Sequence, residues 1–176
     1  MKTFWLTWLK RLVIAGIVGF VLIQLVPVER SNPPVTQEIQ WNSAETEQLA
    51  ERACMDCHSN ESEWPWYSYV APVSWLVAHD VEEGRQKLNF SEWDQPNEDA
   101  DEIVEQVEEG EMPLTKYVIL HPEANLSNAE RQTLLAGLEQ TLANDPPVGE
   151  HGEGGRDNDD REENEREEAE HEDDDD

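Results

Sequence analysis

Two cysteines, the only ones in this 176-residue chain, lie three positions apart, and a histidine follows the second. Cys54, Cys57 and His58 therefore form a Cys-x-x-Cys-His motif, which is the spelling of a c-type haem attachment site. Two thiols about one helical turn apart can add to the two vinyl groups of a porphyrin. The histidine next to them can supply a nitrogen ligand to the iron. The motif predicts one haem c, covalently attached through Cys54 and Cys57.

Two other kinds of site share part of this motif. A Cys-x-x-Cys pair alone could be a thiol-disulfide redox centre or half of a zinc site. A zinc site usually has a second pair of ligands at a similar spacing, and the spacing of His79 and His121 fits no familiar zinc finger. A dithiol enzyme needs a strand-rich scaffold, and no stretch of this chain alternates like a half-buried strand.

A haem iron held by His58 takes a sixth ligand or leaves that position open. Met112 is the first candidate, because it lies in a Gly-Glu-Met-Pro loop after a predicted helix end, and a Met/His ligand pair raises the reduction potential. His79 is the alternative and would give a bis-histidine haem, with His121 as a weaker one. Met55 lies inside the attachment motif and cannot reach the opposite face of the haem.

Aromatic residues follow the motif closely. Trp64, Trp66 and Tyr67 are expected to form walls of a haem pocket, with indole N–H or phenol O–H groups directed to polar partners, although plain core packing explains each of them equally well. Arg85 is a candidate partner for a haem propionate, because a guanidinium fork suits a carboxylate.

The N-terminal segment reads as a signal anchor. An uncharged run extends from Leu12 to Val28, about 26 Å long as a helix and slightly under the ~30 Å of a bilayer core, and Trp8 and Leu9 can extend it. A cleaved signal peptide is the main alternative, but the run ends without a clear small-x-small cleavage site. Three cations precede the run, at Lys2, Lys10 and Arg11, which predicts a cytoplasmic N-terminus. We expect residues 1–28 to be the anchor, with residues 5–28 contacting the cytoplasmic membrane.

The remainder divides into three parts. Residues 29–41 contain two adjacent prolines, which favour an extended path. We expect this segment to be a linker. Residues 42–147 are long enough for one domain. Its expected helices span 44–54, 72–84, 98–109 and 128–143, the last opened by a Ser-x-x-Glu capping box. The predicted fold class is all-α: a small cytochrome c-like domain of about four helices around a covalent haem, and we expect it to be largely unfolded without that haem.

The chain is strongly acidic. Its net charge is −29, of which −13 lies in residues 150–176, where 16 Asp and Glu face three Arg. Residues 148–176 are therefore expected to be a disordered acidic tail that serves as a solvating segment or docks to a basic partner. The rest of the chain is acidic too, at −16, so a direct role on nucleic acid is not expected.

The order of short motifs in this chain resembles that of the bacterial haem-binding domain family, over about residues 45–143. The plan, with a helix entering the attachment motif, a Met-Pro loop and a C-terminal helix, is also similar to class I cytochromes c. The resemblance implies thioether attachment at Cys54 and Cys57, a proximal ligand at His58 and a distal ligand at Met112. Its blocks are Cys54–Asn60, Trp64–Ser68, Ala71–Leu76, His79–Arg85 (with an extra residue in its gap), Leu88–Trp93, Gly110–Pro113 and His121–Ala124.

These features predict a membrane-anchored mono-haem cytochrome that passes single electrons to redox partners in the periplasm or membrane. Resemblance to c-type cytochromes implies a haem domain on the extracytoplasmic side of a bacterial cytoplasmic membrane. The sequence favours an electron carrier over an enzyme. The alternatives are a haem enzyme or sensor whose sixth position is open to peroxide or a diatomic gas, a dithiol oxidoreductase, and a scaffold in which the haem is structural.

Overall fold

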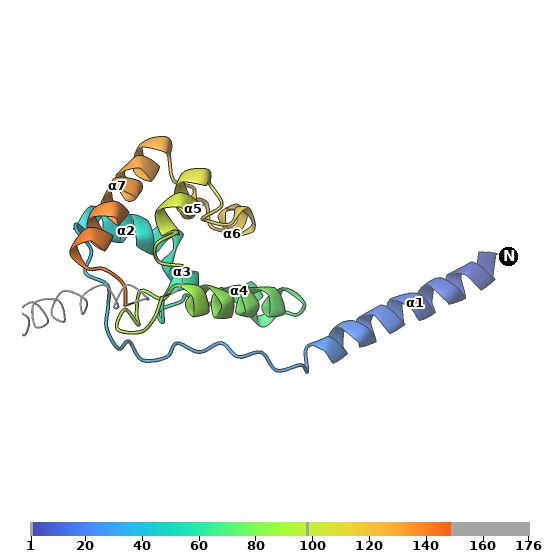
Figure 1. Ribbon diagram of the computed structural model, residues 1–176. Coiled ribbons are helices and arrows are strands. Elements are labelled where there is room, and N and C mark those ends of the chain that lie inside the picture. Colours follow the sequence, from blue (N-terminus) through green and yellow to red (C-terminus); the bar gives the residue numbers. More distant parts are fainter. Residues whose placement is uncertain (1, 98, 149–176) are drawn as a thin grey trace, which may run out of the picture.

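The structure, a computed structural model, describes residues 2–97 and 99–148 (Figure 1). Within these ranges all regular secondary structure is helical, which confirms the predicted fold class. The only β pairing there is at isolated bridges. The helices are α1 (Lys2–Ile23), α2 (Ala44–Ala53), α3 (Met55–His58), η1 (Trp66–Tyr69), α4 (Val73–Lys87), α5 (Ile103–Glu109), α6 (Thr115–Leu120), η2 (Pro122–Ala124) and α7 (Asn128–Asn144).

Helix α1 projects away from the other helices (Figure 1). Its segment Phe4–Ile23 is long and apolar enough to cross a membrane, and none of it is buried inside the protein. A signal sequence near an N-terminus has the same properties, so length and composition show only that α1 could be an anchor. The helix ends at Ile23, five residues before the predicted end at Val28, because backbone hydrogen bonds from residues 24–26 form a turn ahead of Pro27, which disfavours helix before it.

Helices α2 and α7 cross at a point where there is no room for a side chain. A β-carbon added to Gly137 would lie 2.2 Å from the Thr46 hydroxyl oxygen. Thr46 is buried and donates to the side-chain oxygen of Asn42 at 2.6 Å, and the Asn42 backbone N–H donates to the Thr141 hydroxyl at 3.1 Å. This crossing fixes the direction in which α2 enters the attachment motif.

The core lies among α2, α5, α7 and the segment that follows α4. Phe90 and Trp93, each 1% exposed, are its largest side chains. Phe90 N–H donates to the His58 carbonyl at 2.8 Å, and the ring of Phe90 lies 6.3 Å from that of His58. The segment Leu88–Trp93 thus packs against the end of the attachment motif. The buried core residues are Ile39, Leu49, Ala50, Ala53, Leu88, Phe90, Trp93, Ala100, Ile103, Val107, Leu126, Leu134 and Leu138.

Residues 29–41, predicted as a linker, run along the domain in extended conformation (Figure 1). Thr36 and Gln37 N–H groups donate to the Ser91 carbonyl, and Ile39 N–H donates to the Phe90 carbonyl. Further along, Asn60 donates to the Pro34 carbonyl. Backbone pairing therefore holds the segment against the domain.

Several boundaries differ from the predicted ones. Residues 98–109 were expected to be one helix, but α5 begins only at Ile103, because Asp99 N–H donates to the Lys87 carbonyl in a turn of the chain. Helix α4 continues three residues past Gly84, and α6 was not predicted. The Ser127–Glu130 capping box and the left-handed Gly110 at the end of α5 are confirmed. The predicted acidic tail lies outside the described residues, except for Val148.

Candidate functional site

The turn between α2 and α3 places the three motif residues. Cys54 lies between the two helices as the C-cap of α2 and the N-cap of α3, and the N–H groups of Cys57 and His58 donate to its carbonyl at 3.1 and 3.0 Å. This single helical turn brings the two cysteines to the same side, as the motif predicts. Both cysteines are free thiols and half-buried.

One cavity of about 280 Å³ brings the four principal predicted residues together: Cys54, Cys57, His58 and Met112 all line it. Its remaining walls come from α2, α4 and the segment from residue 113 to α6. They are Ala53, Asp80, Glu83, Gly84, Lys87, Pro113, Leu114, Lys116 and Tyr117.

His58 is held in the form that can ligate a metal. Its Nδ1 lies 3.1 Å from the backbone carbonyl oxygens of both Gly84 and Leu88. A carbonyl only accepts, so Nδ1 carries the proton and Nε2 keeps its lone pair. Burial lowers the pKa of His58, which favours the neutral ring. Within the described residues, no hydrogen bond engages Nε2.

The distance between α3 and α4 depends on Gly84. A β-carbon there would lie 2.6 Å from the Cys57 carbonyl oxygen and 3.2 Å from the Cys57 β-carbon. Only glycine allows the two backbones to approach so closely. This contact brings the Gly84 carbonyl within reach of His58. The sequence singled out the segment that contains Gly84 but gave this residue no role.

The cysteines are held as protonated thiols. Burial raises the pKa of Cys54 to about 12, and burial with the nearby Asp56 carboxylate does the same to Cys57. A dithiol enzyme needs a thiol whose pKa is lowered, because the thiolate is the nucleophile. The environment therefore opposes the dithiol interpretation.

Met112 reaches the cavity from a tight loop. Gly110 ends α5 in the left-handed conformation, and the N–H groups of Glu111 and Met112 both donate to the Gln106 carbonyl at 3.0 Å. The Met112 side chain is half-buried and packs against the core. The donor set around this cavity, two thiols, an imidazole nitrogen and a thioether sulfur, fits a haem.

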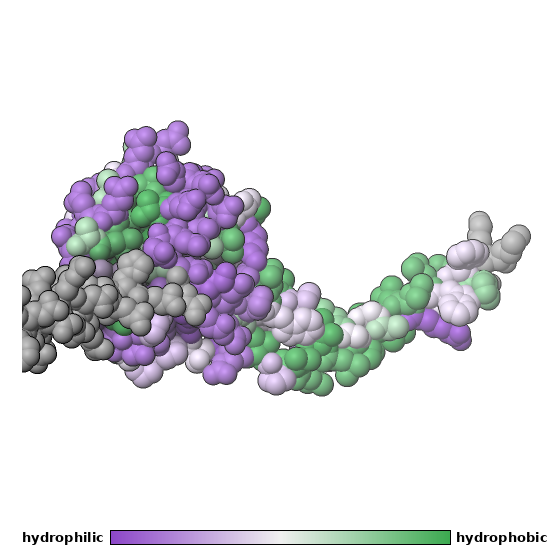
Figure 2. Space-filling model, viewed as in Figure 1, coloured by the Kyte–Doolittle hydropathy of each residue, from purple (hydrophilic) through white to green (hydrophobic). Residues whose placement is uncertain are grey.

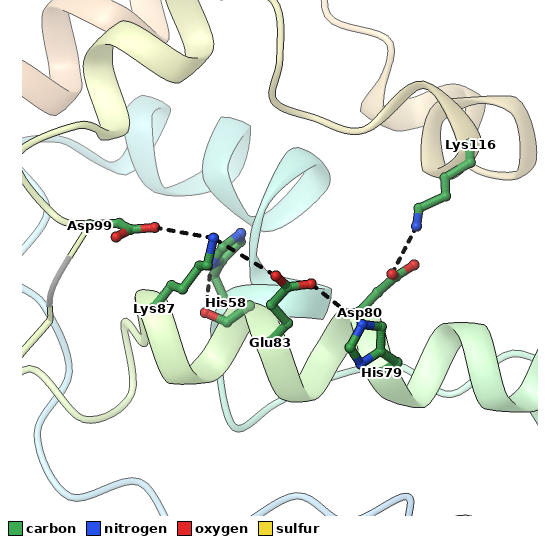
Figure 3. A network of polar contacts seen from close by, with 8 residues as sticks. His58, His79, Asp80, Glu83, Lys87, Asp99 and Lys116 are labelled. Atoms are coloured by element: carbon green, nitrogen blue, oxygen red, sulfur yellow. Dashed lines mark hydrogen bonds and ion pairs between the residues drawn. The ribbon is translucent and has the colours of Figure 1, made fainter.

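Charged side chains surround the cavity (Figure 3). Lys116 of α6 pairs with Asp80 of α4 at 2.8 Å, and Lys87 lies 3.8 Å from both Glu83 and Asp99. All of these except Asp99 line the cavity that His58 enters. Lys87 and Lys116 are cations that the sequence reasoning did not select, since isolated surface lysines carry no sequence signal.

Comparison with known proteins agrees with this geometry. A family model described as "Haem-binding domain" matches residues 18–140, more than half of the chain. The chain belongs to the haem-binding domain family. It is also 30% identical over 105 residues to a cytochrome c peroxidase, Ccp, of Escherichia coli strain K12, in a match that covers 54% of this chain and 22% of that relative. The chain thus spans about a fifth of that protein's length. No solved structure gives a significant match.

In this haem-binding domain, Arg85 makes hydrogen bonds to groups of the protein itself. Its guanidinium donates to the carbonyls of Ser59 and Ser31 at 2.7 and 2.8 Å, and to the side chains of Asn32 and Ser62 at 3.1 and 2.9 Å. It lines a separate groove between α4 and residues 27–33. Arg85 therefore joins the end of the motif to the segment that precedes α2.

The three aromatic residues that were expected to wall the haem pocket lie in two different environments. Trp64 and Tyr67 line a second, smaller cavity of about 110 Å³ that shares Cys57 and Tyr117 with the first. Trp66 is 78% exposed and lines neither cavity. The expected role of Trp66 as a pocket wall therefore has no counterpart in these two cavities.

The alternative histidine ligands lie elsewhere. His79 is on the exposed side of α4, paired with Glu83 at 3.7 Å, and lines the same groove as Arg85. His121 stacks on Tyr117, with ring centroids 4.1 Å apart, and hydrogen bonds with the Tyr67 hydroxyl. Neither lines the cavity that Cys54 and His58 share. No cluster of three metal-binding side chains, of the kind a zinc site needs, occurs among the described residues.

Proposed function

We propose that this chain is a membrane-anchored mono-haem c-type cytochrome that transfers single electrons on the extracytoplasmic side of a bacterial membrane. The observation that carries the proposal is the single cavity onto which Cys54, Cys57, His58 and Met112 all face. A haem bound there would supply one-electron chemistry between Fe(II) and Fe(III).

The cysteines would hold the haem through two thioether bonds. In each, the sulfur bonds to one carbon of a vinyl group while the thiol hydrogen goes to the other carbon. No oxidant is needed, which is consistent with thiols that are protonated. Two such bonds from one helical turn would fix the porphyrin edge beside α3.

His58 and Met112 would be the axial ligands. The two carbonyls that accept from Nδ1 orient the imidazole and raise its basicity. Met112 would supply its sulfur from the loop after α5, whose backbone is held by the Gln106 carbonyl. Two protein ligands keep the coordination nearly the same in both oxidation states, which favours fast electron transfer.

Helix α1 would be the anchor. Lys10 and Arg11 precede its apolar stretch, while the domain beyond it is acidic, and cations remain on the cytoplasmic side. The same orientation would put the haem domain outside the cytoplasm. An acidic domain suits basic redox partners, because opposite charges speed encounter.

A haem stain on a denaturing gel, with the intact mass, tests the attachment. The full chain, expressed with export and haem-attachment machinery, is expected to stain and to gain the mass of one haem. The Cys54→Ser/Cys57→Ser variant is the control and should not stain. A wild-type chain without haem and with two titratable thiols would overturn the proposal.

A reporter fused after residue 148 tests the topology. Alkaline phosphatase is active only outside the cytoplasm, so the fusion should be active and should stay with carbonate-washed membranes. An inactive fusion would contradict the orientation, and an active fusion in the soluble fraction would show that α1 is cleaved.

A haem peroxidase or gas sensor is the second candidate. It is favoured by the similarity to the Escherichia coli cytochrome c peroxidase, and by the fact that only a short loop holds Met112 in place. If Met112 leaves the sixth position free, the reduced protein should bind carbon monoxide readily. Failure to bind carbon monoxide would favour the electron carrier.

A further inference from the structure

The exposed apolar side chains of the domain are confined to one region. Between residues 29 and 148, the large apolar side chains that lie exposed, apart from Val35 and Val148, fall in two short segments of the described chain, 66–76 and 119–120. We call this set the apolar end face. Its members are Trp66, Tyr69, Val73, Trp75, Leu76, Ile119 and Leu120.

The apolar end face is continuous across three elements. Val73 and Leu76 of α4 and Leu120 of α6 line the same small cavity, next to Tyr67 of η1. Figure 2 shows hydrophobic side chains where the domain meets α1 and a second hydrophobic patch on the upper part of the domain, in a visible surface that is otherwise mostly hydrophilic. Clustered exposed apolar groups usually mark a contact surface.

Carboxylates are missing from the segments that form this face. The chain carries 41 Asp and Glu, yet residues 64–79 and residues 112–122 contain none. The cations nearby are Arg30, whose guanidinium lies 4.6 Å from the Tyr69 ring centroid, and Lys116, one helical turn before Leu120. Asp56, Glu63 and Asp80 do line the cavity that these segments share, but the outer segments themselves carry no negative charge, which suits contact with a surface that repels it.

The end of α1 is joined directly to this face. The Gln24 amide donates to the Ala71 carbonyl at 3.2 Å and accepts from the Ala71 N–H at 2.9 Å. Arg30 also donates to the Ser68 carbonyl at 3.2 Å. Trp75 lines a groove together with Pro27 and Val28, the residues that follow α1. Residues 66–76 therefore lie where a membrane-spanning α1 would leave the bilayer.

We propose that the apolar end face lies in the interfacial layer of the same membrane that α1 spans. Tryptophan and tyrosine favour that layer, because one part of each ring system is apolar and another part is polar. Arg30 would reach the lipid phosphates beside it. This inference rests on the proposed anchoring by α1.

Nitroxide labels can test this contact in the full-length holoprotein, reconstituted in phosphatidylcholine vesicles. The variants are Leu120→Cys in the face, Val18→Cys inside α1, and Val148→Cys, whose native side chain is 51% exposed against 56% for Leu120. Unmodified holoprotein controls for stray labelling, and the haem spectrum checks the fold. Each label is probed with oxygen, which concentrates in lipid, and with a neutral nickel chelate, which stays in water.

At Leu120→Cys and Val18→Cys, the oxygen-to-nickel accessibility ratio is expected to be several-fold higher than at Val148→Cys. A ratio at Leu120→Cys equal to that at Val148→Cys would overturn the inference. Shielding from both reagents would also overturn it, because a protein would then cover the face. A Val18→Cys label in water would instead show that the anchoring itself fails.

Discussion

The backbone of Gly84 lies against the carbonyl group of Cys57, so close that an added β-carbon would be only 2.6 Å from the oxygen. The contact couples the two helices that flank the haem cavity, since Cys57 belongs to the attachment turn and Gly84 accepts from His58. It also makes a substitution at this glycine informative.

Gly84→Ala is expected to destabilise the holoprotein by about 1–3 kcal/mol, the usual cost of forcing extra atoms into a packed site. An alanine in a free helical position would instead stabilise by roughly 0.5–1 kcal/mol, so the sign of the change is diagnostic. Chemical denaturation followed by haem absorbance measures it. Gln86→Ala, exposed on the same helix, is the control, and equal stability of both variants would contradict the packing argument.

Met112→Leu is expected to lower the reduction potential by on the order of 0.1 V, within the roughly 0.8 V that axial ligands span. Leucine keeps the bulk of methionine and removes the sulfur donor. The oxidised variant should lose the weak long-wavelength band of a sulfur–iron bond, and the reduced variant should bind carbon monoxide. Met55→Leu, inside the attachment motif, is the matched control and should leave the potential and the band unchanged. A Met112→Leu spectrum identical to wild type would rule out Met112 as a ligand.

Glu130 should contribute acid-sensitive stability. Hydrogen bonds from Arg52 and from Ser127 lower its pKa from 4.5 to about 2, so folding favours the ionised form. The contribution is complete above pH 4.5 and disappears as the pH falls towards 2. Glu130→Gln should be less stable than wild type at pH 6, and this deficit should shrink by pH 3. Thermal unfolding at the two pH values measures it. Glu139→Gln, exposed on the same helix, should show no such trend.

Without haem, the domain is expected to lose most of its helical structure. The core is small, and without haem the empty cavity would leave α3, α4 and α6 without packing on that side. Far-ultraviolet circular dichroism of Cys54→Ser/Cys57→Ser in haem-free form, in the same detergent as the wild-type holoprotein, measures the loss. Helix α1 should remain in both samples. A haem-free spectrum as helical as that of the holoprotein would contradict the expectation.

The features that the sequence predicted well depend on local chemistry. Ser127 with Glu130 forms the predicted capping box of α7. Such caps involve residues three apart, so they can be read without knowing the fold. Four of the residues that line the cavity, Cys54, Cys57, His58 and Met112, were also predicted, because each is either within the motif or in the loop that follows a helix-ending glycine.

The features that the sequence missed depend on contacts between distant segments. Val73 and Leu76 lie at helical spacing within the expected helix 72–84, a pattern typical of a buried stripe, yet they are 40% and 47% exposed, since no other element of the described chain covers them. Gly84 marked the predicted end of a helix, but a helix can continue through a glycine where another backbone packs against it. Arg85 was assigned to a haem propionate, although nothing local shows that Ser31 and Ser59 are its partners.

The segment between α1 and α2 has a consequence for how the molecule moves. A free linker of this kind would let the haem sweep through a volume set by the linker length, and reach several partners from one anchor. Here Arg85 and the carbonyls of Ser91 and Phe90 hold the segment along the domain. Under the proposed function, the haem would therefore keep one height and one orientation above the bilayer. The rate of electron transfer would then be governed by how often partners arrive by diffusion. Adding residues to the segment between α1 and α2 would change this rate only if they also detached the segment from the domain.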